Sequence, residues 1–268
     1  MQLNLVWEII KKDWAETFRS KQILAAVIAF PILMGVILPT FLVGIMRIVP
    51  EAETDPDFDI FEQLLPPLTE DWASLSEKAK GTVMMVIFSQ LFLLFIPIMI
   101  PSTVASDTVV GEKERETIEG LLGLPLTKSE ILLAKIGSSL LPSLFATWII
   151  CVPYVLIVDF LTFPIIGRLL LPNMSFLLII GLLTPLISFI SVTGVVMISS
   201  RVSTTRDAQQ LSVFIVLPLM VLIIGQLFIV LIDIRLIILG IIILAIISFI
   251  TFKIATRIFD RDRLMTSI

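Results

Sequence analysis

Long runs of apolar residues constrain this chain more than any other feature of its sequence. Of its 268 residues, 57% are hydrophobic, against roughly 45–50% in a soluble domain. A helix needs about 20 apolar residues to cross a ~30 Å hydrocarbon core, whereas a membrane barrel shows alternating segments of about ten. The chain has the first pattern, and only helices and closed barrels satisfy their backbone groups in lipid. We therefore expect an all-α, polytopic membrane protein.

Six segments are long enough to span, provided that the apolar run near the C-terminus is divided in two. Leu211 to Phe252 is almost wholly apolar, and Asp233-Ile-Arg235 interrupts it near its middle. A charge at the bilayer centre is costly, so we expect a tight turn there. The stretch 159–173 is too broken to span and is interpreted as an interfacial or re-entrant piece. The predicted spans are about 23–46, 81–101, 136–158, 175–199, 211–232 and 236–256.

Lysine and arginine residues predict the orientation, because cytoplasmic loops carry an excess of them. With the N-terminus inside, the inside segments hold fourteen of the nineteen basic residues. The loop 47–80, with nine acidic residues, then lies outside and both termini are cytoplasmic. A transit-like leader rich in arginine and serine is absent, so a prokaryotic cell membrane is the expected location. The inside segments are 1–22, 105–135, 200–210 and 253–268.

Residues 1–22 are expected to form an amphipathic helix before the first span. Apolar residues recur at steps of three or four and so share one face; they are Leu3, Val6, Ile10, Trp14 and Phe18. Such a helix suits the membrane interface, with tryptophans at headgroup level. Packing on a soluble partner is the alternative. The residues expected at the interface are Trp7, Lys11, Lys12 and Trp14.

The composition excludes several chemistries. The chain has no histidine, which removes histidine triads, metal ligands and proton relays. Its net charge of −4 is not typical of a nucleic-acid-binding protein. Charged residues are absent from the interior of the predicted spans, which argues against proton coupling. Small polar residues in the spans, such as Ser143 and Ser188, are interpreted as helix-packing contacts. We expect no catalytic residue, metal or cofactor in this chain.

The loop between the second and third predicted spans is densely charged. Charged residues crowd its beginning, from Glu112 to Glu116, and apolar residues follow. We expect a helix over 112–122, which Gly123 and Pro125 end. The sequence Thr127-x-x-Glu130 predicts a capping box at the start of the next helix. A short charged helix between two spans suits docking to a soluble partner, and an ordinary solvated loop is the alternative.

This loop resembles the signature of the type-2 ABC permease family, the membrane halves of many ATP-binding-cassette exporters. Glu116 stands where glycine is common in that family, which adds charge without altering the register. The six-span layout, the N-terminal amphipathic helix and the external first loop are also similar. The matching residues are Glu112-Lys113-Glu114-Arg115, Thr117-Ile118-Glu119, Leu121-Leu122, Pro125-Leu126-Thr127, Glu130-Ile131 and Lys135.

The resemblance implies one permease domain over 1–268, in which the 1–22 and 112–124 helices contact a separate ABC ATPase subunit. ATP and Mg are expected in that partner, since this chain lacks a G-x-x-x-x-G-K-[ST] phosphate loop. A second permease copy or a sister permease would complete a path. The expected ATPase-docking residues are Glu112, Glu114, Arg115, Glu116, Glu119, Leu121 and Leu122, with a smaller second contact at Arg206 and Asp207.

Three functions fit these observations. The first is the permease subunit of an ABC exporter, in which a partner ATPase drives an apolar or amphiphilic molecule outward. The second is an ABC-type membrane anchor or mechanotransmission subunit that acts on an external partner through the 47–80 loop. The third is an intramembrane enzyme or channel with a chance loop match, and no catalytic pair supports its enzyme version.

Overall fold

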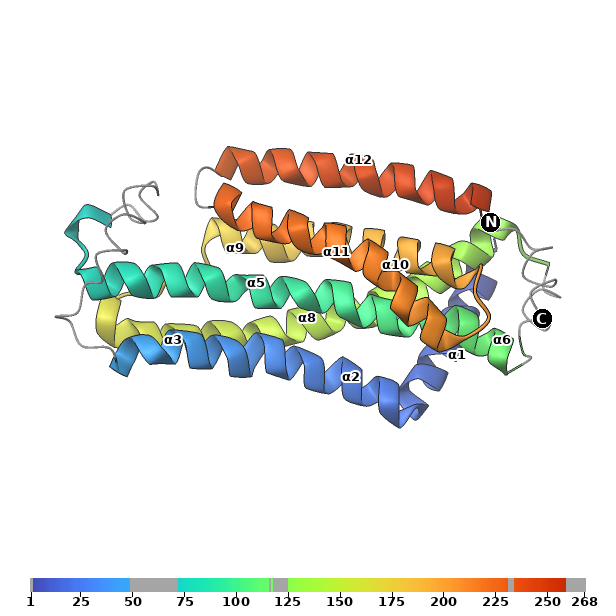
Figure 1. The fold of residues 1–268 in the computed structure, drawn as a ribbon, viewed down its shortest axis with the longest axis horizontal. Coiled ribbons are helices and arrows are strands. Elements are labelled where there is room, and N and C mark those ends of the chain that lie inside the picture. Colours follow the sequence, from blue (N-terminus) through green and yellow to red (C-terminus); the bar gives the residue numbers. More distant parts are fainter. Residues whose placement is uncertain (1, 49–71, 116, 118–124, 231–233, 259–268) are drawn as a thin grey trace.

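The computed structural model describes residues 2–48, 72–115, 117, 125–230 and 234–258. All regular elements among these residues are helices, which confirms the predicted all-α class. The long helices run side by side in an elongated bundle (Figure 1). Five of the described helices are long and apolar enough to cross a membrane. They are Ile23–Ile48, Glu77–Glu114, Lys128–Ile166, Met174–Ser199 and Arg235–Ile258.

Several of the long helices are composed of successive segments. The first comprises α2 (Lys21–Ile32), the π-helical η1 (Leu33–Ile37) and α3 (Leu38–Ile48), and α1 (Leu3–Arg19) precedes it. The second comprises α5 (Glu77–Ser106), the π-helical η3 (Asp107–Gly111) and α6 (Glu112–Glu114), after the 3₁₀ turn η2 (Trp72–Ser74). The remaining elements are α8 (Lys128–Ile166), α9 (Met174–Leu178), the π-helical η4 (Ile179–Leu183), α10 (Thr184–Ser199), α11 (Thr205–Val230) and α12 (Ile234–Ile258).

The predicted span 211–232 corresponds to α11, a helix of 26 residues that begins at Thr205. The last two residues of that span and Asp233 of the predicted turn lie outside the described residues. Ile234 and Arg235, which were expected in the turn, are the first residues of α12. The five long apolar helices support a multi-pass membrane protein. The count of six spans stays a prediction.

The second and third long helices extend well beyond their predicted spans. They contain 38 and 39 residues, and at 1.5 Å per residue each is roughly 57 Å long. This is nearly twice the ~30 Å hydrocarbon core, so both helices must project from it. The charged residues 112–115 therefore sit on the end of a spanning helix. The separate helix expected over 112–122 is replaced, in its described part, by α6 and a turn at Arg115.

The stretch 159–173, expected to be an interfacial or re-entrant piece, is the end of α8 followed by a turn. Helix α8 continues to Ile166, and Gly167 ends it with φ +78°, a left-handed conformation that glycine adopts without steric cost. The Asp159 carboxylate accepts hydrogen bonds from the backbone N–H groups of Leu170 and Leu171, at 3.0 and 3.1 Å. Residues 167–173 are not helical, and this carboxylate holds their backbone against α8.

Helix α5 continues through two prolines because another helix supplies a missing donor. Pro101 has no N–H, so the carbonyl of Pro97 loses its helical partner. The Ser188 hydroxyl of α10 donates to that carbonyl at 3.1 Å, and it also lies 3.2 Å from the Ser143 hydroxyl of α8. Pro97, Ser143 and Ser188 are all buried. These small hydroxyl groups join helices, as was expected from the sequence.

Replacing Ser188 with alanine should lower the free energy of unfolding by about 1 kcal/mol, because the Pro97 carbonyl then lacks a donor in an apolar setting. The variant Pro101→Ala restores a backbone N–H, so Ser188→Ala should cost clearly less in that background. Thermal unfolding of the four proteins in one detergent measures this coupling. Equal costs in the two backgrounds would contradict the assignment.

Candidate functional site

The charged residues 112–115 lie at one end of the bundle, together with α1 (Figure 1). Ends of α8, α10 and α11 contact the same residues. We call this region the helix junction. It is defined by Lys12, Asp13, Glu112, Lys113, Glu114, Arg115 and Lys135.

Helix α1 packs against the first turns of α8 and buries one face there. Its buried residues are Val6, Ile9, Ile10, Asp13 and Thr17. The face predicted from apolar periodicity differs, since Leu3 and Phe18 are 62% and 51% exposed. The buried face of α1 is rotated about the helix axis relative to the predicted one. It therefore includes the carboxylate of Asp13, which faces a buried lysine of α8.

That lysine is Lys135, the centre of a buried ion-pair cluster. Its Nζ lies 3.0 Å from Asp13 Oδ2 and 2.9 Å from Glu112 Oε2. Glu112 Oε1 in turn accepts a hydrogen bond from Lys12 at 2.6 Å. Asp13, Glu112 and Lys135 are each at most 2% exposed. Two carboxylates thus share one buried cation, and Lys12, which is partly exposed, supplies the second positive charge.

Lys113 and Glu114 bind the chain on both sides of the turn between α10 and α11. The Lys113 ammonium donates to the carbonyls of Ser199, Ser200 and Val202, at 3.3, 3.0 and 3.1 Å. A cation at a helix C-terminus pairs with its free carbonyls and with the helix dipole. Glu114 accepts from the backbone N–H and the hydroxyl of Thr205, both at 2.7 Å. The end of α10 and the start of α11 are therefore fixed to α6.

Arg115 completes the set of contacts. Its guanidinium lies 2.9 Å from the carboxylate of Asp107, which is about two turns back along the same long helix. It also lies 3.5 Å from Glu16 of α1. Four consecutive charged residues thus hold α1, α8, α10 and α11 to the end of the second long helix.

Helix α1 has two further attachments to α8. The backbone N–H of Gln2 donates to Glu130 at 2.6 Å, and the predicted capping box of Thr127 and Glu130 is confirmed. The Trp14 indole donates to the Ser138 carbonyl at 3.1 Å. Pro142 leaves that carbonyl without its helical donor, so Trp14 fulfils the same role as Ser188 in the bundle.

The residues expected to dock an ATPase differ in burial. Glu112 is buried and binds within the chain, whereas Glu114 and Arg115 are exposed. Arg206 and Asp207 are exposed in the first turn of α11, next to the Glu114 contact. Trp7 is 44% exposed and has Lys11 over its ring, at 5.8 Å from the centroid. Glu116, Glu119, Leu121 and Leu122 lie outside the described residues.

Sequence reasoning missed Asp13 as a residue of the helix junction and gave Lys113 no role. Asp13 stands three and four positions after Ile10 and Ile9 and four before Thr17, so it interrupts the buried stripe of α1. A carboxylate in such a stripe requires a buried partner. That signal could have identified it, although not its partner.

Burial raises the pKa of Asp13 above its ordinary value, and the nearby Glu112 charge adds to this, while Lys135 opposes it. The folded state therefore binds the Asp13 proton more tightly than the unfolded chain does. The contribution of Asp13 to the free energy of unfolding should fall as the pH rises from 3.8, its ordinary pKa, through the folded-state pKa. The wild type should thus lose stability relative to Asp13→Asn over this range. Unfolding of both proteins between pH 4 and 8 checks the sign, and a relative gain would contradict it.

The fold and the helix junction together define a multi-pass α-helical membrane protein with a charged motif that ties helix ends together. The family model described as ABC-2 family transporter protein matches residues 7–237, most of the chain. The chain therefore belongs to the ABC-2 family of transporter membrane proteins, which confirms the resemblance drawn from the 112–135 motif. Searches of curated proteins and of solved structures found no match.

Proposed function

We propose that this chain is the permease subunit of an ABC exporter. It takes up energy from ATP hydrolysed by a separate ATPase subunit and moves an apolar or amphiphilic molecule outward. A second copy, or a sister permease, completes the path. Family membership supports the pairing with an ATPase. In this proposal the helix junction faces the cytoplasm, as the lysine and arginine distribution predicts.

The helix junction is the observation that carries the proposal. Glu112 joins α1 and α8 through Lys12 and Lys135, and Lys113 and Glu114 bind the turn between α10 and α11. A force applied next to residues 112–115 therefore acts on several helices at once. Such a junction suits a subunit that receives a displacement from outside the membrane and turns it into a rearrangement of the bundle.

The same contacts divide the motif into two roles. Glu112 and Lys113 are buried and hold helices together within the chain. Glu114, Arg115, Arg206 and Asp207 are exposed at the same end, and residues 116–122 continue from it. We therefore propose that the ATPase contacts the exposed residues and the segment after Arg115, while Glu112 transmits the movement.

Charge reversal in this segment tests the docking surface. The variant Glu116→Lys/Glu119→Lys should reduce the amount of ATPase that co-purifies with the tagged chain about tenfold or more, since like charges across an interface cost several kcal/mol. The matched control is Glu51→Lys/Glu53→Lys, the same charge change in the loop predicted outside. Unchanged co-purification in the first variant, with the control behaving identically, would contradict docking at this segment.

A further inference from the structure

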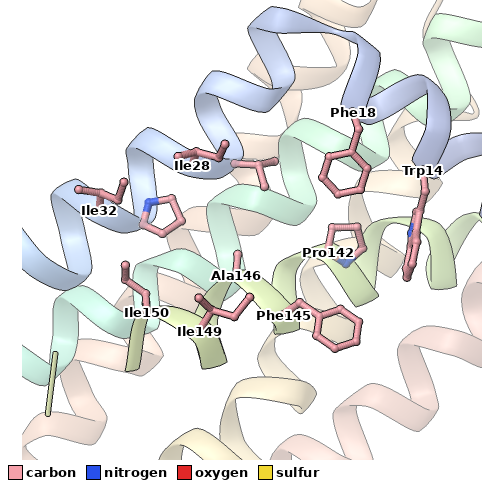
Figure 2. Close-up of a pocket in the computed structure, with 11 residues that line it drawn as sticks. Trp14, Phe18, Ile28, Ile32, Pro142, Phe145, Ala146, Ile149 and Ile150 are labelled. Atoms are coloured by element: carbon pink, nitrogen blue, oxygen red, sulfur yellow. The ribbon is translucent and has the colours of Figure 1, made fainter. Parts of the chain in front are cut away.

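An apolar groove of about 360 Å³ lies between the α1–α2 pair and α8. Figure 2 shows Trp14 and Phe18 of α1 at one end of it. Ile28 and Ile32 of α2 line one side, and Phe145 and Ile149 of α8 line the other. All of these side chains except Trp14 are exposed, and the predicted spans 23–46 and 136–158 place α2 and α8 in lipid. The groove therefore opens toward hydrocarbon rather than toward water.

The chain bends where the groove ends. Ser20 is extended, with φ −76° and ψ 108°, and it separates the last residue of α1 from the first residue of α2. Those two residues are Arg19 and Lys21. Both are exposed, and within the described part of the chain neither forms an ion pair. Lys21 lies two residues before the predicted start of the first span, and we therefore place it at the level of the lipid headgroups.

An apolar groove with two unpaired cations at its end fits a molecule with an apolar chain and an anionic head. We propose that the groove holds an acyl chain of an anionic phospholipid, whose phosphate binds Arg19 and Lys21. With the predicted orientation this lipid belongs to the cytoplasmic leaflet. Basic residues near the membrane surface attract anionic lipids by about 1 kcal/mol each.

A helix from a second copy of the chain fits the groove less well. With its side chains a helix is about 10–12 Å across. Such a helix would also have to bring an anionic group to Arg19 and Lys21. An acyl chain is narrower, and its phosphate supplies that charge.

Quenching of Trp14 fluorescence tests the site directly, because Trp14 lines the groove. The full chain with Trp7→Phe, Trp72→Phe and Trp148→Phe retains only Trp14 and is reconstituted in phosphatidylcholine vesicles. Phosphatidylglycerol with brominated acyl chains should quench Trp14 at a mole fraction up to about 30-fold below that needed for brominated phosphatidylcholine, given two basic contacts. The measurement needs neither an ATPase nor a transported substrate, so its result is independent of the proposed function.

Two variants and a matched control decide the interpretation. Arg19→Gln/Lys21→Gln should raise the phosphatidylglycerol requirement to that of phosphatidylcholine, and Ala146→Phe, which fills the groove, should reduce quenching by both lipids. The control Lys253→Gln/Arg257→Gln removes two cations from the end of α12 and should leave the preference unchanged. Equal quenching by the two lipids, unaffected by the Arg19 and Lys21 changes, would overturn the proposal in favour of nonspecific lipid contact. Quenching by neither lipid, in protein that remains helical and monodisperse, would overturn it in favour of a groove covered by a second copy.

Discussion

Replacing Lys135 with methionine should lower the free energy of unfolding by about 3–5 kcal/mol, because it leaves two buried carboxylates without their shared cation. Lys135 lies within 3.0 Å of both Asp13 and Glu112, and all three are almost fully buried. Methionine keeps most of the length of the lysine side chain, so the effect is mainly that of the lost charge. For a chain of this size the change corresponds to a fall in Tm of roughly 6–20 °C. Thermal unfolding of detergent-solubilised protein measures it.

Neutralising the whole cluster distinguishes the effect of unpaired buried charge from a general sensitivity of position 135 to substitution. The variant Asp13→Asn/Glu112→Gln/Lys135→Met buries no unpaired charge and should recover most of the lost stability. Lys11→Met serves as a control, since Lys11 is exposed and pairs with the exposed Glu8, so solvent can compensate for its loss. A cost below about 1 kcal/mol for Lys135→Met alone, the scale of an exposed ion pair, would contradict a buried ionic cluster.

Replacing Lys113 with methionine should release the turn between α10 and α11. Three carbonyls then lose a charged donor, and a hydrogen bond to a charged group contributes about 1.5–3 kcal/mol. A local loss of 2 kcal/mol raises the population of the opened turn about 30-fold. Arg201 lies in this turn and is exposed. Limited trypsin digestion, with the cleavage after Arg201 followed by mass spectrometry, should be faster by a similar factor.

The control for this prediction is Lys11→Met, which removes an exposed lysine from α1. Lys113→Arg keeps the charge at the carbonyls and should restore most of the protection. A cleavage rate after Arg201 that does not change in Lys113→Met would mean that the ammonium does not hold the end of α10.

The sequence was sufficient for the class of fold because hydrophobicity acts locally. A run of apolar residues must be a helix in lipid whatever its neighbours are, and the described helices follow those runs. Helix ends were harder to predict. The second span was predicted to end at 101, near Pro97 and Pro101, yet the helix continues to Glu114. The donor that permits this is Ser188, some ninety residues away in sequence.

A similar long-range donor stabilises α8 near its end. Pro164 leaves the Phe160 carbonyl without its helical partner, and Arg47 donates to it at 3.3 Å. No pattern within one helix identifies such a donor, because it comes from another helix.

The position of the candidate site in the sequence was predictable, but the burial and the partners of its residues were not. The run of charges from Glu112 to Arg115 pointed to the segment at which the helix junction lies, and its role in docking an ATPase stays a prediction. Whether each charge faces outward or inward depends on partners such as Lys12, Lys135 and Thr205, which tertiary packing alone brings near. Glu112 and Glu114 stand two residues apart, yet one is buried and the other exposed.

Purification of the tagged chain from its own membranes in a mild detergent tests the central claim most directly. If the chain is an ABC permease, it should bring with it a protein that contains a G-x-x-x-x-G-K-[ST] phosphate loop. The two should be present in equal amounts, and the complex should hydrolyse ATP. A helical, monodisperse chain that purifies alone, or only with proteins that lack such a loop, would contradict the proposal.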